Sequence, residues 1–138
     1  MKEPKLGAVD KLNRVFIYGT LIPGQVRWDH LAEYVQATEP DSTAGLLYST
    51  PYGYPAARFD GTNTLPQQIQ GQLMTIRPEL LDECFELLDE VESAVVGLYH
   101  RVVVETSRGH KAWSYQYGIG IDNLELIQSG SWMAHIGQ

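Results

Sequence analysis

The segment from Pro78 to Glu92 constrains the fold of this 138-residue chain most strongly. At about 100° per residue, its apolar side chains fall within one arc of roughly 160°, and its acids project outside that arc with one exception. Pro78 suits the first turn of a helix, and acids near the start suit the helix dipole. We therefore predict an amphipathic helix from Pro78 to about Glu92. Its apolar residues are Leu80, Leu81, Cys84, Phe85, Leu87, Leu88 and Val91.

Short segments rich in β-branched and aromatic residues lie on both sides of this helix and predict strands. A second, shorter helix is expected at 28–36. Several strands around one strong helix indicate an α+β fold with a mixed or mostly antiparallel sheet, and the strand count allows a small β-barrel. We expect one domain over 1–138, with 1–12 as a loose lead-in. The strands are expected at 14–18, 44–49, 54–59, 69–76, 99–106 and 111–117.

Composition limits the classes of partner and the compartment. A net charge of −7 argues against binding to nucleic acid or to an anionic membrane. The single cysteine, Cys84, excludes an intrachain disulfide, and the N-terminal residues lack the apolar run of a secretory signal. No apolar stretch approaches the roughly 20 residues of a membrane span. A cytoplasmic location is therefore expected.

Glu92 is the one acid that shares the apolar arc of the helix, because it follows Leu88 by four residues and Phe85 by seven. A carboxylate on a core-facing stripe is costly unless it is paired, exposed or perturbed. Burial raises the pKa of a carboxyl group towards neutrality, which a general acid or base requires. The alternative is that the helix ends by residue 91, which would leave Glu92 in solvent.

A second candidate site follows the first strand, at Tyr18-Gly19-Thr20-Leu21. Backbone N–H groups exposed there could hold a carboxylate or an oxyanion, although Gly-Thr is also ordinary turn chemistry. Tyr99 and Tyr115 lie on predicted strands, where a tyrosine either packs in a core or lines a pocket. Arg101 shares a strand face with Tyr99, and could pair with a buried carboxylate or be solvated.

Other chemistries lack support in the sequence. The histidines, at 30, 100, 110 and 135, have no metal-ligand spacing, and Cys84 is expected in the core. Gly118-Ile119-Gly120 lacks the third glycine of a dinucleotide fingerprint. Neither a Gly-x-Ser-x-Gly elbow nor a P-loop is present. We therefore expect no metal and no cofactor.

Taken together, these segments resemble the γ-glutamylcyclotransferase-like family. The strand that ends in Tyr18-Gly19-Thr20-Leu21, and the helix that ends in Leu88-Asp89-Glu90-Val91-Glu92, match its motifs in the same order. Tyr99-His100-Arg101 opens the next strand. An aromatic strand around Trp113-Ser114-Tyr115 and a closing segment at 127–132 follow. The resemblance spans nearly the whole chain.

The resemblance implies a small barrel-like α+β fold and release of 5-oxoproline from a γ-glutamyl small molecule, without metal or cofactor. Glu92 would be the acid/base, and the backbone of Tyr18-Gly19-Thr20-Leu21 would hold the substrate's α-carboxylate. Tyr99 and Tyr115 would line the pocket. The family usually has glycine after the catalytic glutamate, where this chain has Ser93.

Ser93 leaves two alternatives open. One is a non-catalytic protein that binds a small molecule in the same pocket. The other is an enzyme that removes a γ-glutamyl protecting group from an acylated metabolite. The sequence does not indicate an oligomeric state.

Overall fold

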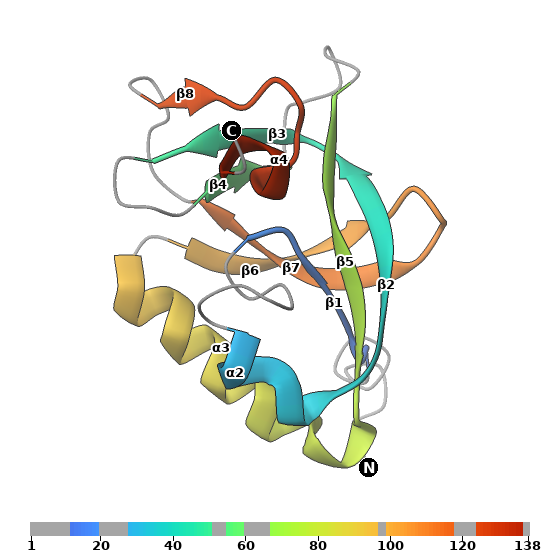
Figure 1. The fold of residues 1–138 in the computed structure, drawn as a ribbon. Coiled ribbons are helices and arrows are strands. Elements are labelled where there is room, and N and C mark those ends of the chain that lie inside the picture. The colour runs from blue at the N-terminus through green and yellow to red at the C-terminus, as the bar shows by residue number, and fades with distance from the viewer. Residues whose placement is uncertain are drawn as a thin grey trace.

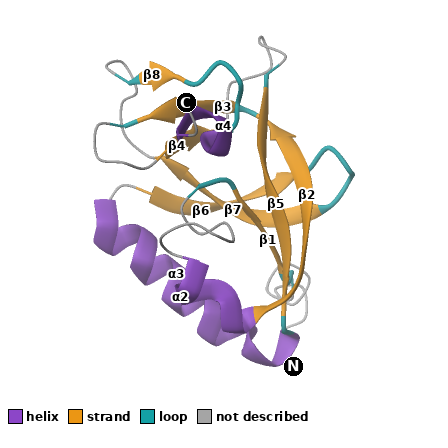
Figure 2. Ribbon diagram, viewed as in Figure 1, coloured by secondary structure: helices purple, strands orange, loops and turns teal. Residues whose placement is uncertain are grey.

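The fold is built from two β-sheets and one long helix (Figures 1 and 2). The computed structural model describes residues 12–19, 28–50, 55–59, 67–96, 99–117 and 124–136, with the side chains of 30 and 89–100 excepted. Within these ranges strands predominate, and α3 (Leu81–Val96) is the main helix, so the α+β class is confirmed. No described helix is long and apolar enough to cross a membrane.

The larger sheet has five strands in the order β2-β5-β1-β7-β6. The central strand, β1, pairs antiparallel with β5 and parallel with β7, and the remaining neighbours are antiparallel. The sheet is therefore mixed, as expected. These strands are β1 (Arg14–Ile17), β2 (Val35–Ala44), β5 (Gln68–Ile76), β6 (Tyr99–Glu105) and β7 (Lys111–Tyr117).

A smaller sheet of three strands has the order β4-β3-β8. Its strands are β3 (Leu46–Ser49), β4 (Pro55–Arg58) and β8 (Glu125–Leu126), and the short helix α4 (Trp132–Ile136) follows. The predictions at 44–49, 54–59, 69–76, 99–106 and 111–117 therefore each correspond to an observed strand.

Strand β1 is buried on both faces because its side chains alternate between two cores. Val15 and Ile17 belong to a core under α3, whereas Phe16 and Tyr18 belong to a core towards the smaller sheet. The first core also contains Leu31, Tyr34, Met74, Ile76, Cys84, Phe85, Leu88 and Tyr115. The second also contains Leu47, Ala57, Ile69, Leu73, Val104, Ala112, Ile127 and Trp132.

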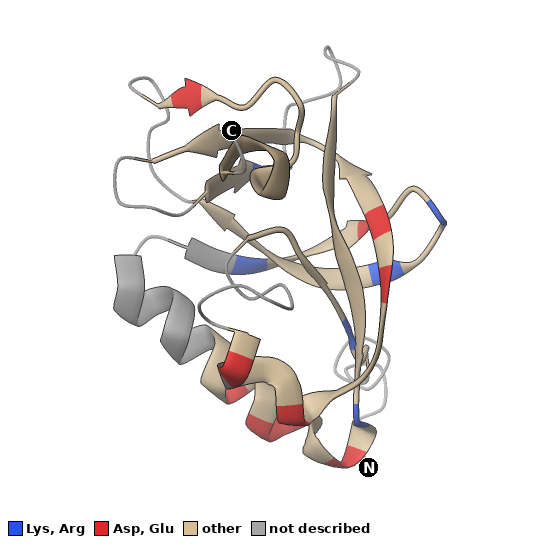
Figure 3. Ribbon diagram, in the orientation of Figure 1, with Lys and Arg blue, Asp and Glu red and all other residues tan. Residues whose placement is uncertain are grey.

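Helix α3 follows a 3₁₀ turn, η2 (Pro78–Leu80), and its phase agrees with the predicted apolar arc. Cys84, Phe85 and Leu88 are buried. The acids Glu79, Asp82, Glu83 and Glu86 are exposed, and Figure 3 shows acidic positions gathered on the described part of this helix. The helix continues through Glu92 to Val96. The alternative that it ends by residue 91 is therefore wrong.

The predicted helix at 28–36 is too long. An α-helical turn, α2 (Trp28–Leu31), passes into a 3₁₀ turn, η1 (Ala32–Tyr34), and β2 begins at Val35. Most of β2 was missed because it is a polar, largely exposed edge strand that contains Pro40. Proline is tolerated at a sheet edge, since its missing N–H removes no bond from a central ladder.

The expected small β-barrel is not closed within the described residues. Strands β2 and β6 are the two edges of the larger sheet in the described residues. Hydrogen bonds join them at one end, where Ser107 N–H donates to the Ser42 carbonyl at 2.7 Å and Thr43 Oγ1 donates to the Glu105 carbonyl at 3.1 Å. Closure requires a continuous ladder between the edges, and these isolated bonds leave the sheet open.

Candidate functional site

Three strand ends meet on one side of the larger sheet. Val15 of β1 lies opposite Trp113 of β7 in a parallel pair, so Gly19 and Tyr117 lie at the same level four residues further on. Tyr117 in turn pairs with Tyr99, the first residue of β6. The chain that leaves β1 therefore emerges beside the end of β7 and the start of β6.

Helix α3 reaches the same end of the sheet. The Phe85 ring packs edge-on against Trp113, with ring centroids 6.1 Å apart, and α3 and β7 run towards the same side (Figure 1). Position 92 lies about 10 Å further along the helix axis than Phe85. Tyr115 and Tyr117 lie about 7 Å and 13 Å beyond Trp113. Residue 92 is thus placed at the level of these two tyrosines.

Tyr18 ties the end of β1 to β7. Its hydroxyl donates a buried hydrogen bond of 2.6 Å to the Tyr115 carbonyl. Its ring also packs edge-on against Phe59, with centroids 6.2 Å apart. One residue earlier on β7, the Ser114 hydroxyl donates to the Phe16 carbonyl at 2.8 Å. These two side-chain bonds hold the junction of β1 and β7 in place.

Gly19 is required by close packing. A β-carbon at this position would lie 2.8 Å from Cγ of Pro55, the first residue of β4. A residue with a β-carbon would fit at this position only if the Pro55 ring moved. The glycine therefore lets the end of β1 pass against the smaller sheet and leaves no side chain over the junction.

Of the predicted site residues, Tyr18, Gly19 and Tyr115 are brought together at this junction. Tyr115 is buried in the core under α3. Glu92 and Tyr99 are placed by their backbones in α3 and β6, and their side chains lie outside the described residues. Thr20 and Leu21 also lie outside the described residues.

An arginine between two aromatic rings lies beside the junction. The Arg101 guanidinium is 4.7 Å from the centroid of Phe85 and 4.6 Å from that of Trp113. The sequence singled out Arg101 but neither of the two rings. The two-residue spacing of Trp113 and Tyr115 was a signal for Trp113, because it places both residues on one face of the strand. The three residues border a cavity of about 520 Å³, which is also lined by Pro78, Glu79, Leu81 and Asp82.

Cys84 is a core residue, as predicted. It is fully buried beneath α3, and burial, with a smaller contribution from Glu83, raises the pKa of its thiol to about 12. The thiol is therefore protonated at neutral pH and is a poor nucleophile. Glu83 also accepts a hydrogen bond of 3.2 Å from the Tyr34 hydroxyl. Burial and this carboxylate raise the pKa of Tyr34.

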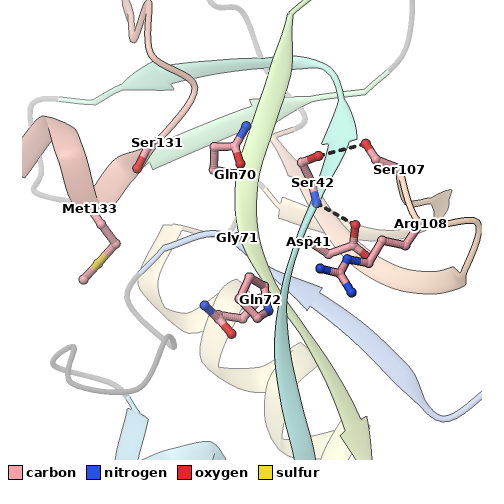
Figure 4. A pocket seen from close by; sticks show the side chains of 10 residues that line it. Asp41, Ser42, Gln70, Gly71, Gln72, Ser107, Arg108, Ser131 and Met133 are labelled. Carbon is pink, nitrogen blue, oxygen red and sulfur yellow. Dashed lines mark hydrogen bonds between the residues drawn. The ribbon is translucent and has the colours of Figure 1, made fainter.

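A second cavity, of about 710 Å³, lies at the other end of β6 and β7 (Figure 4). Its lining is mainly polar and includes none of the predicted site residues. Asp41 is buried there and accepts the N–H of Ser42 at 2.8 Å through Oδ1. Its Oδ2 has no hydrogen-bond partner among the described residues. This cavity is therefore not part of the candidate site.

Comparison with known proteins identifies relatives of similar length. The protein YtfP of Escherichia coli, named as a γ-glutamylcyclotransferase family protein, is 32% identical over 122 residues, which cover 87% of this chain and 96% of YtfP. The solution structure of YtfP superposes with a TM-score of 0.56 at 29% identity and covers 89% of this chain and 98% of that one.

Two crystal structures share the fold. YkqA from Bacillus subtilis has a TM-score of 0.67 at 25% identity, over 90% of this chain but 40% of YkqA, so this chain spans less than half of that protein. An AIG2-like protein from Mus musculus has a TM-score of 0.58 at 15% identity, over 86% of this chain and 87% of that one. At this identity the mouse protein supports the fold alone.

The family assignment rests on the sequence as a whole. The model of the family described as "Gamma-glutamyl cyclotransferase, AIG2-like" matches residues 15–134, which include α3, β6, β7 and all of β1 except Arg14. With YtfP related over nearly its full length, the match shows that this chain belongs to the AIG2-like γ-glutamyl cyclotransferase family.

Proposed function

We propose that this chain is a γ-glutamyl cyclotransferase, which converts a γ-glutamyl amide into 5-oxoproline and a free amine. The observation that carries the proposal is the convergence of the end of β1, the second half of α3, the start of β6 and the end of β7. Membership of the family supports the same reaction class. The substrate is a small molecule that fits between the helix and the strand ends.

The loop after β1 binds the substrate's α-carboxylate in this proposal. Gly19 places no side chain over the junction, and the backbone N–H groups of 19–21 would supply the donors. Consecutive backbone N–H groups in a turn form a concave site for an anion. The Tyr18–Tyr115 hydrogen bond at 2.6 Å keeps this loop anchored to β7. Tyr99 and Tyr115 line the remaining walls.

The reaction is an intramolecular acyl transfer. The substrate's α-amine attacks its own γ-carbonyl carbon, a new C–N bond closes the five-membered ring, and the original amide C–N bond breaks. Because the nucleophile is tethered, holding the chain in an attack geometry supplies several kcal/mol of the barrier, of the order of the roughly 7–11 kcal/mol known for well-oriented intramolecular reactions.

Glu92 moves the proton in this scheme. Its carboxylate takes a proton from the α-ammonium, which frees the lone pair for attack, and then returns a proton to the departing nitrogen. The attacking nitrogen loses a second proton as the lactam forms, and the released amine takes it up, so the amine ends as an ammonium ion and the carboxylate is regenerated. General acid–base catalysis of this kind contributes about 10²–10⁴-fold to the rate. Position 92 follows the buried Leu88 by one helical turn in α3, and this spacing supports the assignment of Glu92.

The proposal is tested by measuring 5-oxoproline and released amine with three substrate groups. These are γ-glutamyl amino acids, γ-glutamyl-lysine-type amides and γ-glutamylated metabolites. We expect stoichiometric release of both products from at least one group, loss of release in Glu92→Gln, and normal release in Glu86→Gln. Glu86 is an exposed acid on the same helix and is a matched control.

The products also distinguish the alternatives raised by Ser93. Glutamate in place of 5-oxoproline would mean hydrolytic removal of a γ-glutamyl group. Saturable binding without either product would mean a non-catalytic binding protein. Both outcomes contradict cyclotransferase activity.

A further inference from the structure

We propose that Arg101 is a positioning residue that clamps α3 onto the sheet and so fixes the place of Glu92 over the junction. The inference rests on the proposed function, because it assigns Arg101 a role in that same reaction. Arg101 does not contact the substrate in this proposal; it acts through the helix.

The clamp joins three elements that are separate in the chain. Arg101 comes from β6, Phe85 from α3 and Trp113 from β7, and the guanidinium lies within 4.7 Å of both ring centroids. A guanidinium attracts the negative faces of aromatic rings, and this attraction strengthens where water is partly excluded. Phe85 is 6% exposed, and Arg101 and Trp113 are half-buried. The contact therefore binds the helix to the β6–β7 pair in a partly desolvated groove.

The position of the clamp connects it to the catalytic end of the sheet. Arg101 is the cross-strand partner of Tyr115, and it follows Tyr99 on the same face of β6. Phe85 and residue 92 lie two turns apart on one side of a continuous helix. Fixing Phe85 against Trp113 therefore also fixes the depth and rotation of residue 92 on the same helix.

The cavity beside Arg101 also leaves space into which α3 could shift if the contact of Arg101 with the two rings were lost. The cavity of about 520 Å³ lies against Arg101, Phe85 and Trp113, so this part of the interface is not closed by other packing. At the helix start, the Tyr34–Glu83 hydrogen bond of 3.2 Å is a second tie, but it is part-buried and involves an exposed acid. Loss of the guanidinium would leave α3 attached but less well fixed.

The expected signature is a loss of kcat rather than of substrate binding. A displacement of about 1 Å in a reacting group costs up to about 100-fold in rate, whereas the anion-binding loop after β1 belongs to other elements and is unaffected. Arg101→Met keeps the length of the side chain and removes the charge, and Arg101→Lys keeps the charge but not the planar group that stacks on the rings.

The experiment measures kcat and KM for 5-oxoproline release, with hydrogen exchange of α3 amides as an independent readout. In Arg101→Met we expect kcat to fall by about 10-fold or more, KM to stay within about threefold, and exchange to rise in 85–96. The kcat and the α3 hydrogen exchange of Arg101→Lys should lie between those of Arg101→Met and the wild type. Arg108→Met is the control, since Arg108 is an exposed arginine in the β6–β7 turn, and it should leave all three quantities unchanged.

Two results would contradict the proposed role of Arg101. One is wild-type kcat in Arg101→Met, and the other is a lower kcat with unchanged α3 exchange. If Arg101→Met does not fold, Arg101→Lys decides between the same outcomes. Failure of the proposed function gives a different result. If the wild-type protein has no Glu92-dependent turnover, both the reaction and the role of Arg101 in it are refuted. The hydrogen-exchange data then report only whether Arg101 holds α3 in place.

Discussion

The buried hydrogen bond from Tyr18 to Tyr115 yields a prediction with a defined magnitude. Tyr18→Phe removes one hydroxyl and keeps the ring, which is 7% exposed and packs on Phe59. The variant loses a hydrogen bond whose net contribution to stability is about 1 kcal/mol. It also leaves the buried Tyr115 carbonyl without the hydroxyl donor at 2.6 Å, which adds to the cost.

We therefore expect the free energy of unfolding to decrease by about 1–2 kcal/mol. For a chain of this length, each kcal/mol corresponds to roughly 3–5 °C in Tm, so Tm should fall by about 3–10 °C. Urea denaturation followed by circular dichroism gives the free energy, and calorimetry gives Tm. The m-value should remain unchanged, because the surface exposed on unfolding is almost the same.

The control is Tyr48→Phe. Tyr48 is half-buried on β3, and its side chain makes no hydrogen bond within the described residues. Its loss of stability should stay below about 0.5 kcal/mol. Equal stabilities of Tyr18→Phe and the wild type would refute the assignment of the hydroxyl as a structural tie. If Tyr48→Phe lowers the free energy of unfolding as much as Tyr18→Phe, the buried hydrogen bond of Tyr18 is not the cause of the loss of stability.

Two further predictions concern buried and strained positions. Cys84 has a thiol pKa raised from 9.0 to about 12 by burial, so the unfolded chain releases this proton first as pH rises. This group should therefore leave stability unaffected below about pH 9 and lower it by about 1.4 kcal/mol per pH unit between the two pKa values. This part of the fall should be absent in Cys84→Ala, and an identical pH profile of the two proteins would contradict it. Gly109 and Gly130 both have positive φ, but a β-carbon at Gly130 would also overlap the Gln68 carbonyl, whereas at Gly109 it meets open space. Gly109→Ala should cost about 1 kcal/mol and Gly130→Ala clearly more, as measured by urea denaturation. Equal costs would refute the close approach of the two backbones.

Much of the secondary structure was predictable because burial leaves a periodic trace. The alternation in β5 and β7 and the apolar arc of α3 located these elements within a few residues. The end of α3 was placed too early, since the motif that drew attention to Glu92 is not a stop signal. The first strong signal for a helix end, Gly97, comes five residues later.

The remaining errors concern features that depend on distant partners. Strand β2 is polar and holds Pro40, so only its pairing with β5 reveals it as a strand. Whether the sheet closes depends on how far the edges β2 and β6 stay in register, which no local pattern encodes. The Arg101 clamp likewise needed the fold, because its three residues come from different elements. The family resemblance named the site residues, and of these the fold brings Tyr18, Gly19 and Tyr115 together.

The most direct test of the account is the single-turnover rate of Glu92→Gln at saturating γ-glutamyl substrate, with substrate affinity measured on the same protein by calorimetry. We predict that 5-oxoproline formation slows by about 100-fold or more relative to wild type and to Glu86→Gln, while affinity changes little. Near-normal turnover in a folded Glu92→Gln protein would contradict the central claim that this carboxylate moves the proton.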